Sequence, residues 1–361
     1  MGKTIGVLTG GGDCPGLNAV LRGVVKTAMT KYGYKVIGFR DGYRGLVLND
    51  CVEFKSGDVS GILDKGGTII GTSNKDNPFH FKVEIDGNVE YKDMSATVME
   101  TVRRHGIDCM VLIGGDGTLT SARDFSRMGM NVIGVPKTID NDLCATDTTF
   151  GFMTAVDTAT DALDKLHSTA ESHHRVMILE VMGRYAGWIA LEAGIAGGAD
   201  VILIPEIPFD IDKVVGKIIE RKNAGKAFSI VVVAEGARSV SGEVVVSKVL
   251  KDSPDPVRLG GIGNHIAEDV ERLTCIETRV TVLGHLQRGG RPVPYDRILS
   301  TRYGVGAVEL VHNEQFGRMV SLQGDRIVSV PLEEAVGKLK TVPPDGELVS
   351  IAKSVGVGFG D

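Results

Sequence analysis

The sequence predicts an α/β protein with largely parallel sheets, arranged as two domains of similar class with a cleft between them. Short apolar runs alternate along the chain with segments of helical periodicity, which is typical of parallel strands joined by crossover helices. The chain has 361 residues, and a length near 150 residues per domain leads us to expect about two domains. Glycine accounts for 48 of the 361 residues, and its clusters after apolar runs allow a backbone to approach a ligand closely.

The first half of the chain opens on an apolar run, Thr4–Thr9, which ends in three glycines. A second run, Cys109–Ile113, is apolar throughout, as is typical of parallel strands that are covered on both faces. The other elements expected here are a helix over residues 17–30, a strand over Lys35–Phe39, a helix over Met94–His105, a helix after Thr118 and a strand over Asn131–Val135.

The second half restarts this alternation with a long helix. Its apolar face is formed by residues that recur every three to four positions, namely Phe152, Val156, Ala159, Leu163 and Leu166. The elements expected next are strands over Val176–Val181, Val201–Ile204, Ser229–Ala234 and Thr278–Leu283, and helices near Ala186–Ala193, Ile211–Arg221, His265–Arg272 and Asp296–His312. The polar segment 240–258 is expected to form a hairpin or a loop.

Charge and composition argue against several classes of protein. The formal net charge is −6, whereas a general nucleic-acid-binding protein needs a basic face. No apolar run reaches the ~18 residues of a membrane span, and the N-terminus has no signal-peptide pattern, so we expect no membrane partner. Five cysteines without a CxxC pair argue against a disulfide framework and a zinc site, so we expect a cytoplasmic protein. Cys14 lies at a predicted helix start, which would lower the pKa of its thiol.

Two glycine-rich loops each follow a predicted strand and open a predicted helix. Gly10–Gly16 and Gly114–Thr118 therefore place backbone N–H groups and a helix N-terminus where they can hold phosphate. The first loop is not a P-loop, because Leu17 stands where that motif needs lysine. The carboxylate of Asp116 is suited to Mg²⁺, which prefers one or two carboxylates together with phosphate oxygens. Either loop taken alone is also explained by a tight strand-to-helix turn.

The segment Pro136–Asp142 follows another predicted parallel strand, at the sheet edge where α/β proteins bind their ligands. Asp140 and Asp142 are two residues apart, so in an extended segment both side chains lie on one side. One carboxylate could accept a proton from a substrate hydroxyl group while the other orients that group. For Asp142, the alternative is a cap of the following helix.

Arginine is frequent at or near the ends of predicted strands, where a guanidinium group can bind phosphate through two parallel hydrogen bonds. These arginines are Arg175, Arg184, Arg279, Arg288 and Arg291. For any one of them, a surface salt bridge is the simpler explanation. The segment His285–Gly290 is more informative, because donors and glycines gather there after a strand.

Taken together, these segments resemble the phosphofructokinase family, in the family's order and from residue 4 to about residue 310. The matching segments are GVLTGGGDCPGLNAV, GGT at 66–68, IGGDGT, PKTIDND, EVMGRYAGWIAL, VVVAEGA and LGHLQRGG. The resemblance implies the phosphofructokinase fold, with two Rossmann-like three-layer domains. It also implies a glycolytic enzyme that uses Mg²⁺ to transfer a phosphoryl group to the 1-hydroxyl group of fructose 6-phosphate. The sugar substrate rests on the resemblance alone.

The resemblance further implies how the chain is divided and assembled. Residues 1–150 with about 287–335 are expected to form the phosphoryl-donor domain. Residues 151–286 with the tail 336–361 are expected to form the fructose 6-phosphate domain. Arg175 and Arg279 match arginines that the family takes from a neighbouring subunit, so we expect a homodimer or homotetramer with shared active sites.

The matched motifs also assign roles to residues of this chain. Asp140 matches the general base, Asp142 the second acid of the motif, and Asp116 the position that binds Mg²⁺. The other residues matched to catalysis are Thr138, Arg184 and Gly12. The residues matched to the phosphoryl donor are Gly11, Gly12, Lys75, Gly115, Asp116, Gly117 and Thr118, with Lys75 standing near a frequent arginine of the family. The residues matched to the sugar phosphate are Thr138, Ile139, Asp140, Arg175, Met182, Gly183, Arg184, Glu235, Arg279, His285, Leu286, Gln287 and Arg288.

Two positions bear on the phosphoryl donor, and they point in different directions. Pyrophosphate-using relatives place an aspartate at the position of Gly117, where its side chain would crowd and repel the α-phosphate of ATP. Lys137, in contrast, resembles the pyrophosphate users, because many ATP-using bacterial members have glycine there. We expect ATP, since the absent side chain at Gly117 leaves room and Lys137 can lie beside either donor. The alternative is a pyrophosphate-dependent fructose 6-phosphate 1-phosphotransferase.

Two further functions serve as alternatives. An NAD kinase or a diacylglycerol kinase would share the GGDGT loop but would not account for PKTIDND, MGRYAG or HLQRGG. A non-catalytic subunit or metabolite sensor on this fold would be expected to lose the base or the metal carboxylate. Asp116, Asp140, Asp142 and Arg184 are all present, which favours an enzyme.

Overall fold

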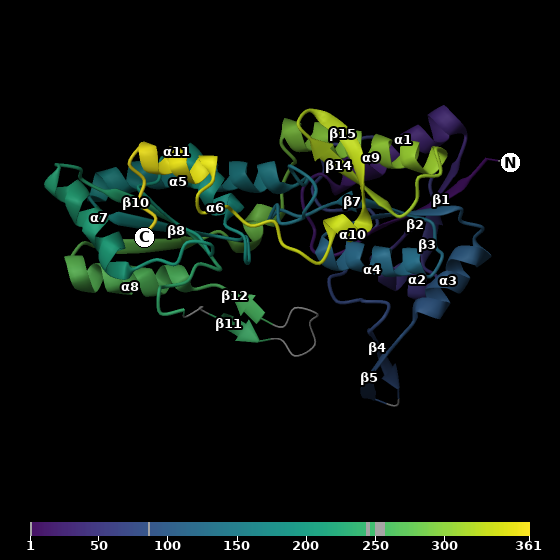
Figure 1. The fold of residues 1–361 in the computed structure, drawn as a ribbon, viewed down its shortest axis with the longest axis horizontal. Helices are drawn as coiled ribbons and strands as arrows, with labels where there is room; N and C mark the ends of the chain where they lie inside the picture. Colours follow the sequence, from purple (N-terminus) through teal and green to yellow (C-terminus); the bar gives the residue numbers. More distant parts are fainter. Residues whose placement is uncertain (1, 86, 243–245, 250–256) are drawn as a thin grey trace.

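A computed structural model of the chain describes residues 2–85, 87–242, 246–249 and 257–361. In these residues the chain forms two halves, each built on its own sheet with helices on both faces (Figure 1). We call them the large-sheet half and the small-sheet half. The N-terminus belongs to the large-sheet half, whereas the C-terminus lies in the small-sheet half (Figure 1). The predicted α/β fold with largely parallel sheets is confirmed.

The large sheet has seven strands within the described residues, in the spatial order β15–β14–β7–β6–β1–β2–β3. The five strands from β14 to β2 are parallel, and one antiparallel strand lies at each edge. Their bounds are β1 (Thr4–Thr9), β2 (Lys35–Phe39), β3 (Cys51–Glu53), β6 (Cys109–Gly114), β7 (Val132–Pro136), β14 (Arg318–Gln323) and β15 (Arg326–Pro331). Every residue of β6 is buried, as expected for a strand covered on both faces.

The small sheet is entirely parallel in the described part of the chain, in the order β13–β8–β10–β9. Its strands are β8 (Val176–Val181), β9 (Val201–Leu203), β10 (Ser229–Ala234) and β13 (Thr278–Val282). Two antiparallel ribbons stand apart from both sheets: β4 (Phe81–Ile85) with β5 (Asn88–Lys92), and β11 (Val246–Val249) with β12 (Val257–Leu259). Of the segment predicted as a hairpin or loop, residues 243–245 and 250–256 lie outside the described residues.

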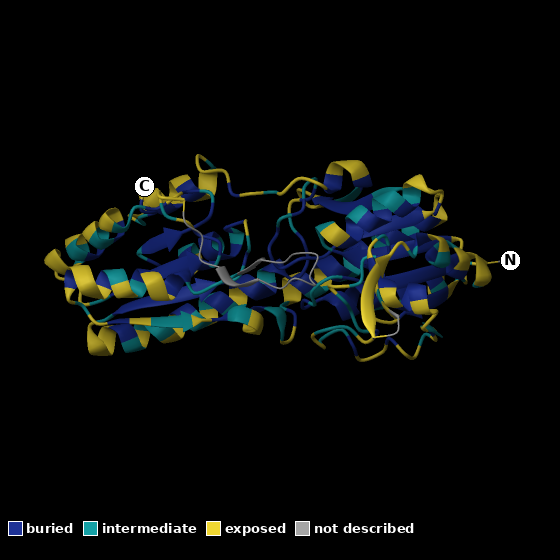
Figure 2. Ribbon diagram, turned by 90° about the horizontal axis from the view of Figure 1, so that it is seen from below, coloured by how far each residue is buried: buried dark blue, intermediate teal, exposed yellow. Residues whose placement is uncertain are grey.

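Helices cover both faces of each sheet (Figure 1). On the large sheet, one face carries α1 (Leu17–Tyr32) and α9 (Pro294–His312), and the other carries α2 (Tyr43–Leu48), α3 (Ser95–Arg104), α4 (Asp116–Arg127) and α10 (Leu332–Ala335). On the small sheet, one face carries α5 (Phe152–His173), α6 (Trp188–Ala196) and α11 (Glu347–Ser354), and the other carries α7 (Ile211–Asn223) and α8 (Ile262–Thr274). Buried residues follow both sheets through the elongated molecule (Figure 2). One continuous apolar core joins the α1–α9 face to the α5–α6 face across the two halves.

The element boundaries differ from the predictions by a few residues. The helix expected near Ala186–Ala193 begins at Trp188, because the chain first makes a tight turn in which Gly183 and Arg184 both have positive φ. The hairpin β14–β15, the helices α10 and α11 and the short elements α2, β3, β4 and β5 were not predicted.

Three connections pass between the halves in the described chain: residues 137–151 after β7, residues 283–293 after β13 and residues 336–346 after α10. We call the first of these the 137–151 loop. A short 3₁₀ helix, η1 (Gly284–Arg288), lies in the second. The division into two domains, with the boundaries given above, stays a prediction.

Candidate active site

A cavity of about 540 Å³ lies between the halves, at the carboxyl ends of β1, β6 and β7 and of β8 in the facing half. Ligands of parallel sheets bind at this edge. The cavity brings together many of the predicted site residues: Gly11, Gly12, Gly115, Asp116, Gly117, Thr118, Lys137, Thr138, Asp140, Asp142, Arg184 and Arg288.

The two glycine-rich loops lie side by side because Thr118 packs between them. A Cβ atom would lie 2.7 Å from Thr118 Oγ1 at Gly10 and 2.3 Å from Thr118 Cβ at Gly114, so neither position accepts a side chain. A Cβ atom added at Gly117, in contrast, would meet no described atom within 4 Å. Helix α4 starts at this point, and no described side chain caps it, so its first N–H groups are available to an anion.

Asp116 is the first residue of α4 and lines the cavity. Its Oδ1 atom accepts a hydrogen bond of 3.0 Å from the backbone N–H of Gly337. That bond fixes one carboxylate oxygen and leaves the other for a ligand. In the described residues no cluster of three acidic, histidine or cysteine side chains could hold a metal ion alone. This donor set fits Mg²⁺, which completes its coordination with phosphate oxygens and water.

Lys137 is almost fully buried beside the first loop, with 4% of its surface exposed. Its Nζ atom donates a hydrogen bond of 2.5 Å to the carbonyl oxygen of Gly12. Burial lowers the pKa of the Lys137 ammonium. Burial therefore disfavours the charged form of this amine, and a bound anion would favour it.

Asp140 is 5% exposed, and in the described structure its Oδ1 atom is buried without a hydrogen-bond partner. Such an atom costs free energy and is typical of a functional site. The backbone N–H of Asp140 donates to Thr138 Oγ1 at 3.1 Å, and this bond stabilises the local turn of the chain. Burial, with the neighbouring charge of Asp140, raises the pKa of Asp142 to about 6. Both carboxylates line the same cavity, as predicted, but the segment is not extended as the spacing argument assumed, because Asn141 between them has φ of 52°.

The facing half contributes Arg184, at the end of the turn after β8. Arg184 has φ of 51°, and its backbone N–H donates to Glu235 Oε1 at 3.2 Å. A Cβ atom at Gly236 would lie 1.8 Å from the carbonyl oxygen of Arg184, so this contact requires glycine. Burial, followed by the charge of Asp140, raises the pKa of Glu235 to about 7. The carboxylates of the two halves therefore influence each other across the cavity.

Other predicted residues lie behind or beside the cavity lining. Gln287 is fully buried, and its Oε1 accepts a hydrogen bond of 2.8 Å from the Met182 backbone. Arg288 lines the cavity and donates to the carbonyl oxygen of Asp13 at 3.3 Å. The predicted residues outside the described lining are Lys75, Ile139, Arg175, Met182, Gly183, Glu235, Arg279, His285, Leu286 and Gln287.

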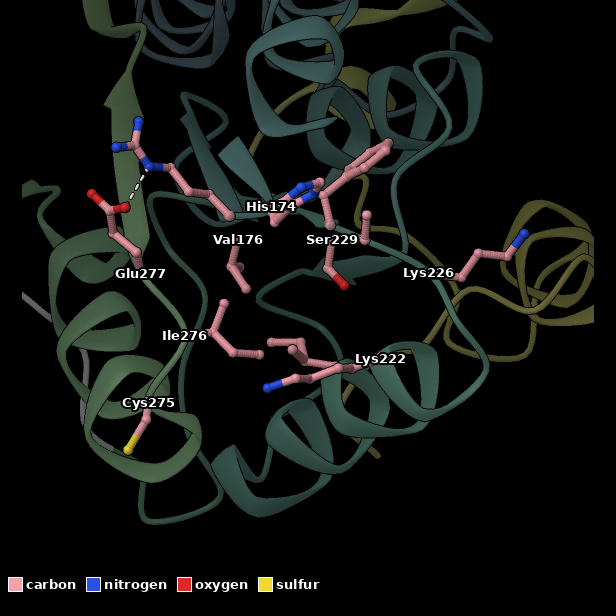
Figure 3. Close-up of a pocket in the computed structure, with 12 residues that line it drawn as sticks. His174, Val176, Lys222, Lys226, Ser229, Cys275, Ile276 and Glu277 are labelled. Carbon is pink, nitrogen blue, oxygen red and sulfur yellow. Dashed lines mark ion pairs between the residues drawn. The ribbon is translucent and has the colours of Figure 1, made fainter. Parts of the chain in front are cut away.

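Arg175 and Arg279 lie at the amino ends of β8 and β13, whereas the cavity lies at the carboxyl ends of the strands. Arg175 pairs with Glu277 at 2.7 Å beside a separate pocket of about 360 Å³ (Figure 3). Arg279 pairs with Glu277 and with Glu271. Neither guanidinium group reaches the cavity of its own chain.

The cavity also contains residues that the sequence analysis missed, among them Tyr43, Tyr185, Gly337, Lys338 and Leu339. No motif marks residues 337–339, which lie about 200 positions after Asp140 in the sequence. One prediction is wrong. Cys14 is fully buried, and burial raises its thiol pKa to about 12, because desolvation outweighs the helix N-terminus.

No helix in the described ranges has both the length and the apolar character needed to cross a membrane.

Comparison with known proteins gives consistent matches over nearly the whole chain. A family model described as Phosphofructokinase matches residues 4–311. The chain is 62% identical over 361 residues to ATP-dependent 6-phosphofructokinase 2 of Clostridium perfringens, with 99% of each chain covered. It is 50% identical over 357 residues to a pyrophosphate–fructose 6-phosphate 1-phosphotransferase of Streptomyces coelicolor, again with 99% of each covered.

A solved structure agrees with these matches. Phosphofructokinase from Saccharomyces cerevisiae matches with a TM-score of 0.79 and 31% identity. The match covers 98% of this chain and 46% of that chain, so this chain spans less than half of the yeast protein. The names of the two bacterial relatives differ in the phosphoryl donor, the same point on which Gly117 and Lys137 differ.

Proposed function

The chain belongs to the phosphofructokinase family, and from that premise we propose that it is an ATP-dependent 6-phosphofructokinase. It transfers the γ-phosphoryl group of ATP to the 1-hydroxyl group of fructose 6-phosphate in glycolysis. The observation that carries this proposal is the cavity in which the two glycine-rich loops, Arg184 and the buried unpartnered oxygen of Asp140 meet. Such a site can hold donor, acceptor and base in contact, which is the main requirement of phosphoryl transfer.

In this mechanism Asp140 is the general base. The 1-hydroxyl group transfers its proton to the Asp140 carboxylate as its oxygen forms a bond to the γ-phosphorus. The bond from that phosphorus to the bridging oxygen of ATP breaks, and ADP leaves. The pKa of Asp142, about 6, keeps this second carboxylate mostly ionised at neutral pH, where it can accept a hydrogen bond from another donor of the sugar phosphate.

Cations and N–H groups around the cavity would stabilise the transferred group. Arg184 enters from the small-sheet half, and Lys137 lies beside Gly12 in the donor loop. The first turn of α4 adds N–H groups on the donor side. In phosphoryl transfer most of the rate acceleration comes from such positioning and charge stabilisation.

We further propose that Asp116 holds Mg²⁺ through the oxygen that Gly337 leaves free. When bound, Mg²⁺ would neutralise negative charge on the phosphate oxygens of the donor. The hydrogen bond from Gly337 holds the Asp116 carboxylate in one orientation, so its second oxygen stays in place for the ion.

The 6-phosphate group is proposed to bind His285 and Arg288 together with Arg175 and Arg279 of a neighbouring copy. The positions of Arg175 and Arg279 support this proposal, because both lie away from the cavity of their own chain. The active enzyme would then be a homodimer or homotetramer with shared sites. We propose that it acts in the cytoplasm and needs neither nucleic acid nor a membrane.

The experiment that tests the function compares ATP and pyrophosphate at matched concentrations, with Mg²⁺ and fructose 6-phosphate. Formation of fructose 1,6-bisphosphate with ATP supports the proposal. Turnover with pyrophosphate alone would replace it with the second candidate, a pyrophosphate-dependent phosphotransferase. The contact of Lys137 with the donor loop and the Streptomyces coelicolor relative favour that candidate.

A further inference from the structure

Lys340 lies in the connection between α10 and α11, and its ammonium group donates three hydrogen bonds to the 137–151 loop. Its Nζ atom donates to Asn141 Oδ1 at 3.0 Å, to the Thr146 carbonyl oxygen at 3.0 Å and to the Asp147 carbonyl oxygen at 2.7 Å. A lysine ammonium has three N–H donors, so these three bonds use its whole capacity. Lys340 is also outside the described lining of the cavity. It is therefore not placed to bind substrate.

The backbone of Lys340 joins the same loop to the other half of the molecule. Its N–H donates to the carbonyl oxygen of Asp142 at 2.9 Å. Its carbonyl oxygen accepts a hydrogen bond of 2.8 Å from the indole N–H of Trp188, the first residue of α6. The Lys340 ammonium lies 5.5 Å from the centre of the Trp188 ring. One residue thus contacts both the loop of Asp140 and Asp142 and the helix that follows Arg184.

The residue that Lys340 holds, Asn141, stands between the two carboxylates of the site. Asn141 has φ of 52°, in the left-handed region that non-glycine residues rarely adopt. Its Oδ1 atom also accepts a hydrogen bond of 3.1 Å from the Thr149 backbone. Without the ammonium group, three acceptors of this loop would lose a charged hydrogen-bond donor: Asn141 Oδ1 and the carbonyl oxygens of Thr146 and Asp147. The loop could then relax and move Asp140 and Asp142.

We propose that Lys340 is a positioning residue for phosphoryl transfer, which holds the Asp140–Asp142 turn against the start of α6. The inference rests on the proposed function, because it assigns Asp140 and Asp142 to the reaction. Lys340 acts through Asn141 and the loop backbone and does not touch the reactants. A displacement of about 1 Å at a reacting group can reduce the rate by about 10², so a loosened loop should affect kcat strongly.

The charge of Lys340 also titrates in an accessible range. Burial lowers the pKa of Lys340 to about 8. The ionisable groups that face it are Asp142, Cys144 and Asp147 from the 137–151 loop and Glu192 from α6. As the pH rises through about 8, the ammonium becomes neutral and loses one N–H donor. Trp188 is the only tryptophan of the chain, so its fluorescence reports on this contact.

The test compares Lys340→Met and Lys340→Arg with wild type, with Lys353→Met as the control. Lys353 belongs to the same C-terminal region but pairs with the terminal Asp361, away from the cavity. In Lys340→Met we expect kcat to fall about tenfold or more, with both KM values within about twofold of wild type. Lys340→Arg should restore part of kcat, and Lys353→Met should match wild type.

Two pH titrations separate positioning from a general loss of stability. In wild type, kcat and Trp188 fluorescence should both change near pH 8, and Lys340→Met should lack both changes. Lys340→Arg should keep its activity to higher pH, because arginine stays protonated. These titrations of wild type also decide the matter if Lys340→Met does not fold.

The outcomes distinguish this inference from the proposed function. If wild type does not phosphorylate fructose 6-phosphate, the proposed function fails. If wild type is active and kcat of Lys340→Met stays within twofold, the inference alone fails. It also fails if wild-type fluorescence and kcat are both unchanged from pH 7 to pH 9.

Discussion

Lys137 and Gly12 lie on different loops and are joined by a hydrogen bond of 2.5 Å from the lysine ammonium to the glycine carbonyl oxygen. The bond crosses from the loop of the proposed base to the loop of the proposed phosphoryl donor. A bound phosphate would therefore meet the same cation whether it belongs to ATP or to pyrophosphate. We therefore propose that the open space at Gly117 separates the two donors.

Replacing Gly117 with aspartate should reduce kcat/KM for ATP at least about tenfold, because like charges brought together cost several kcal/mol. The fold should tolerate the change, since an added Cβ atom meets no described atom within 4 Å. Gly216→Asp is a matched control on α7, where an added Cβ atom also has open space in the described structure. Equal use of ATP by Gly117→Asp and wild type would remove Gly117 from donor selection.

Asp140→Asn should reduce kcat by at least about 10², which is the usual contribution of a general base. KM values should change little, because the substituted amide keeps the size of the side chain. Steady-state kinetics with ATP and fructose 6-phosphate provide the measurement. A variant with near-normal turnover would show that another group accepts the proton.

Asp116→Asn should raise the Mg²⁺ concentration needed for half-maximal activity, by about tenfold or more, because the amide removes a charged ligand. The amide oxygen can still accept the hydrogen bond from Gly337, so the local structure should persist. Removing Mg²⁺ from wild type with a chelator should abolish turnover, and adding it back should restore turnover. An unchanged Mg²⁺ requirement in the variant would place the ion elsewhere.

Arg279→Ala should raise KM for fructose 6-phosphate about tenfold or more, the equivalent of one charged hydrogen bond. If active sites are shared, a copy with Asp140→Asn can supply Arg279 to a copy with Arg279→Ala. Refolding the two variants together should then recover activity that neither variant shows alone at a low concentration of fructose 6-phosphate. Recovery that never exceeds the sum of the separate variants would contradict shared sites.

Glu235→Gln should change how stability depends on pH. The pKa of Glu235 is about 7 in the folded chain, above the ordinary value of 4.5. The folded state therefore binds more protons than the unfolded state, and stability is lost as the pH rises from about 4.5 to about 7. At pH 8 the variant should have a higher free energy of unfolding than wild type, by on the order of 2 kcal/mol. Denaturant unfolding at pH 4.5 and pH 8 measures this, and a difference that is independent of pH would contradict it.

The parts of the site that the sequence predicted are those fixed by local structure. Asp116 and Asp140 lie in the segments that follow two neighbouring buried strands, β6 and β7, so the shared sheet edge places them in one cavity. The hydrogen bond from Gly337 to Asp116 joins residues 221 positions apart, and no local pattern announces it. Cys14 shows the same limit, because its burial depends on packing against Phe150 and Gly151. Periodicity predicted the central strands well. It missed the hairpin β14–β15, whose place in the sheet depends on pairing with β7, about 200 residues earlier in the chain.

The placement of β14 and β15 has a consequence for how the protein is made. By residue 282 a growing polypeptide contains all four described strands of the small sheet. At that stage the large sheet lacks β14 and β15, which span residues 318–331, and α1 lacks its packing partner α9. On the ribosome, the sheet that is begun first is therefore completed after the sheet that follows it, and the small-sheet half then still lacks α11. Until β14 is synthesised, the exposed edge of β7 is the surface that a chaperone would need to protect.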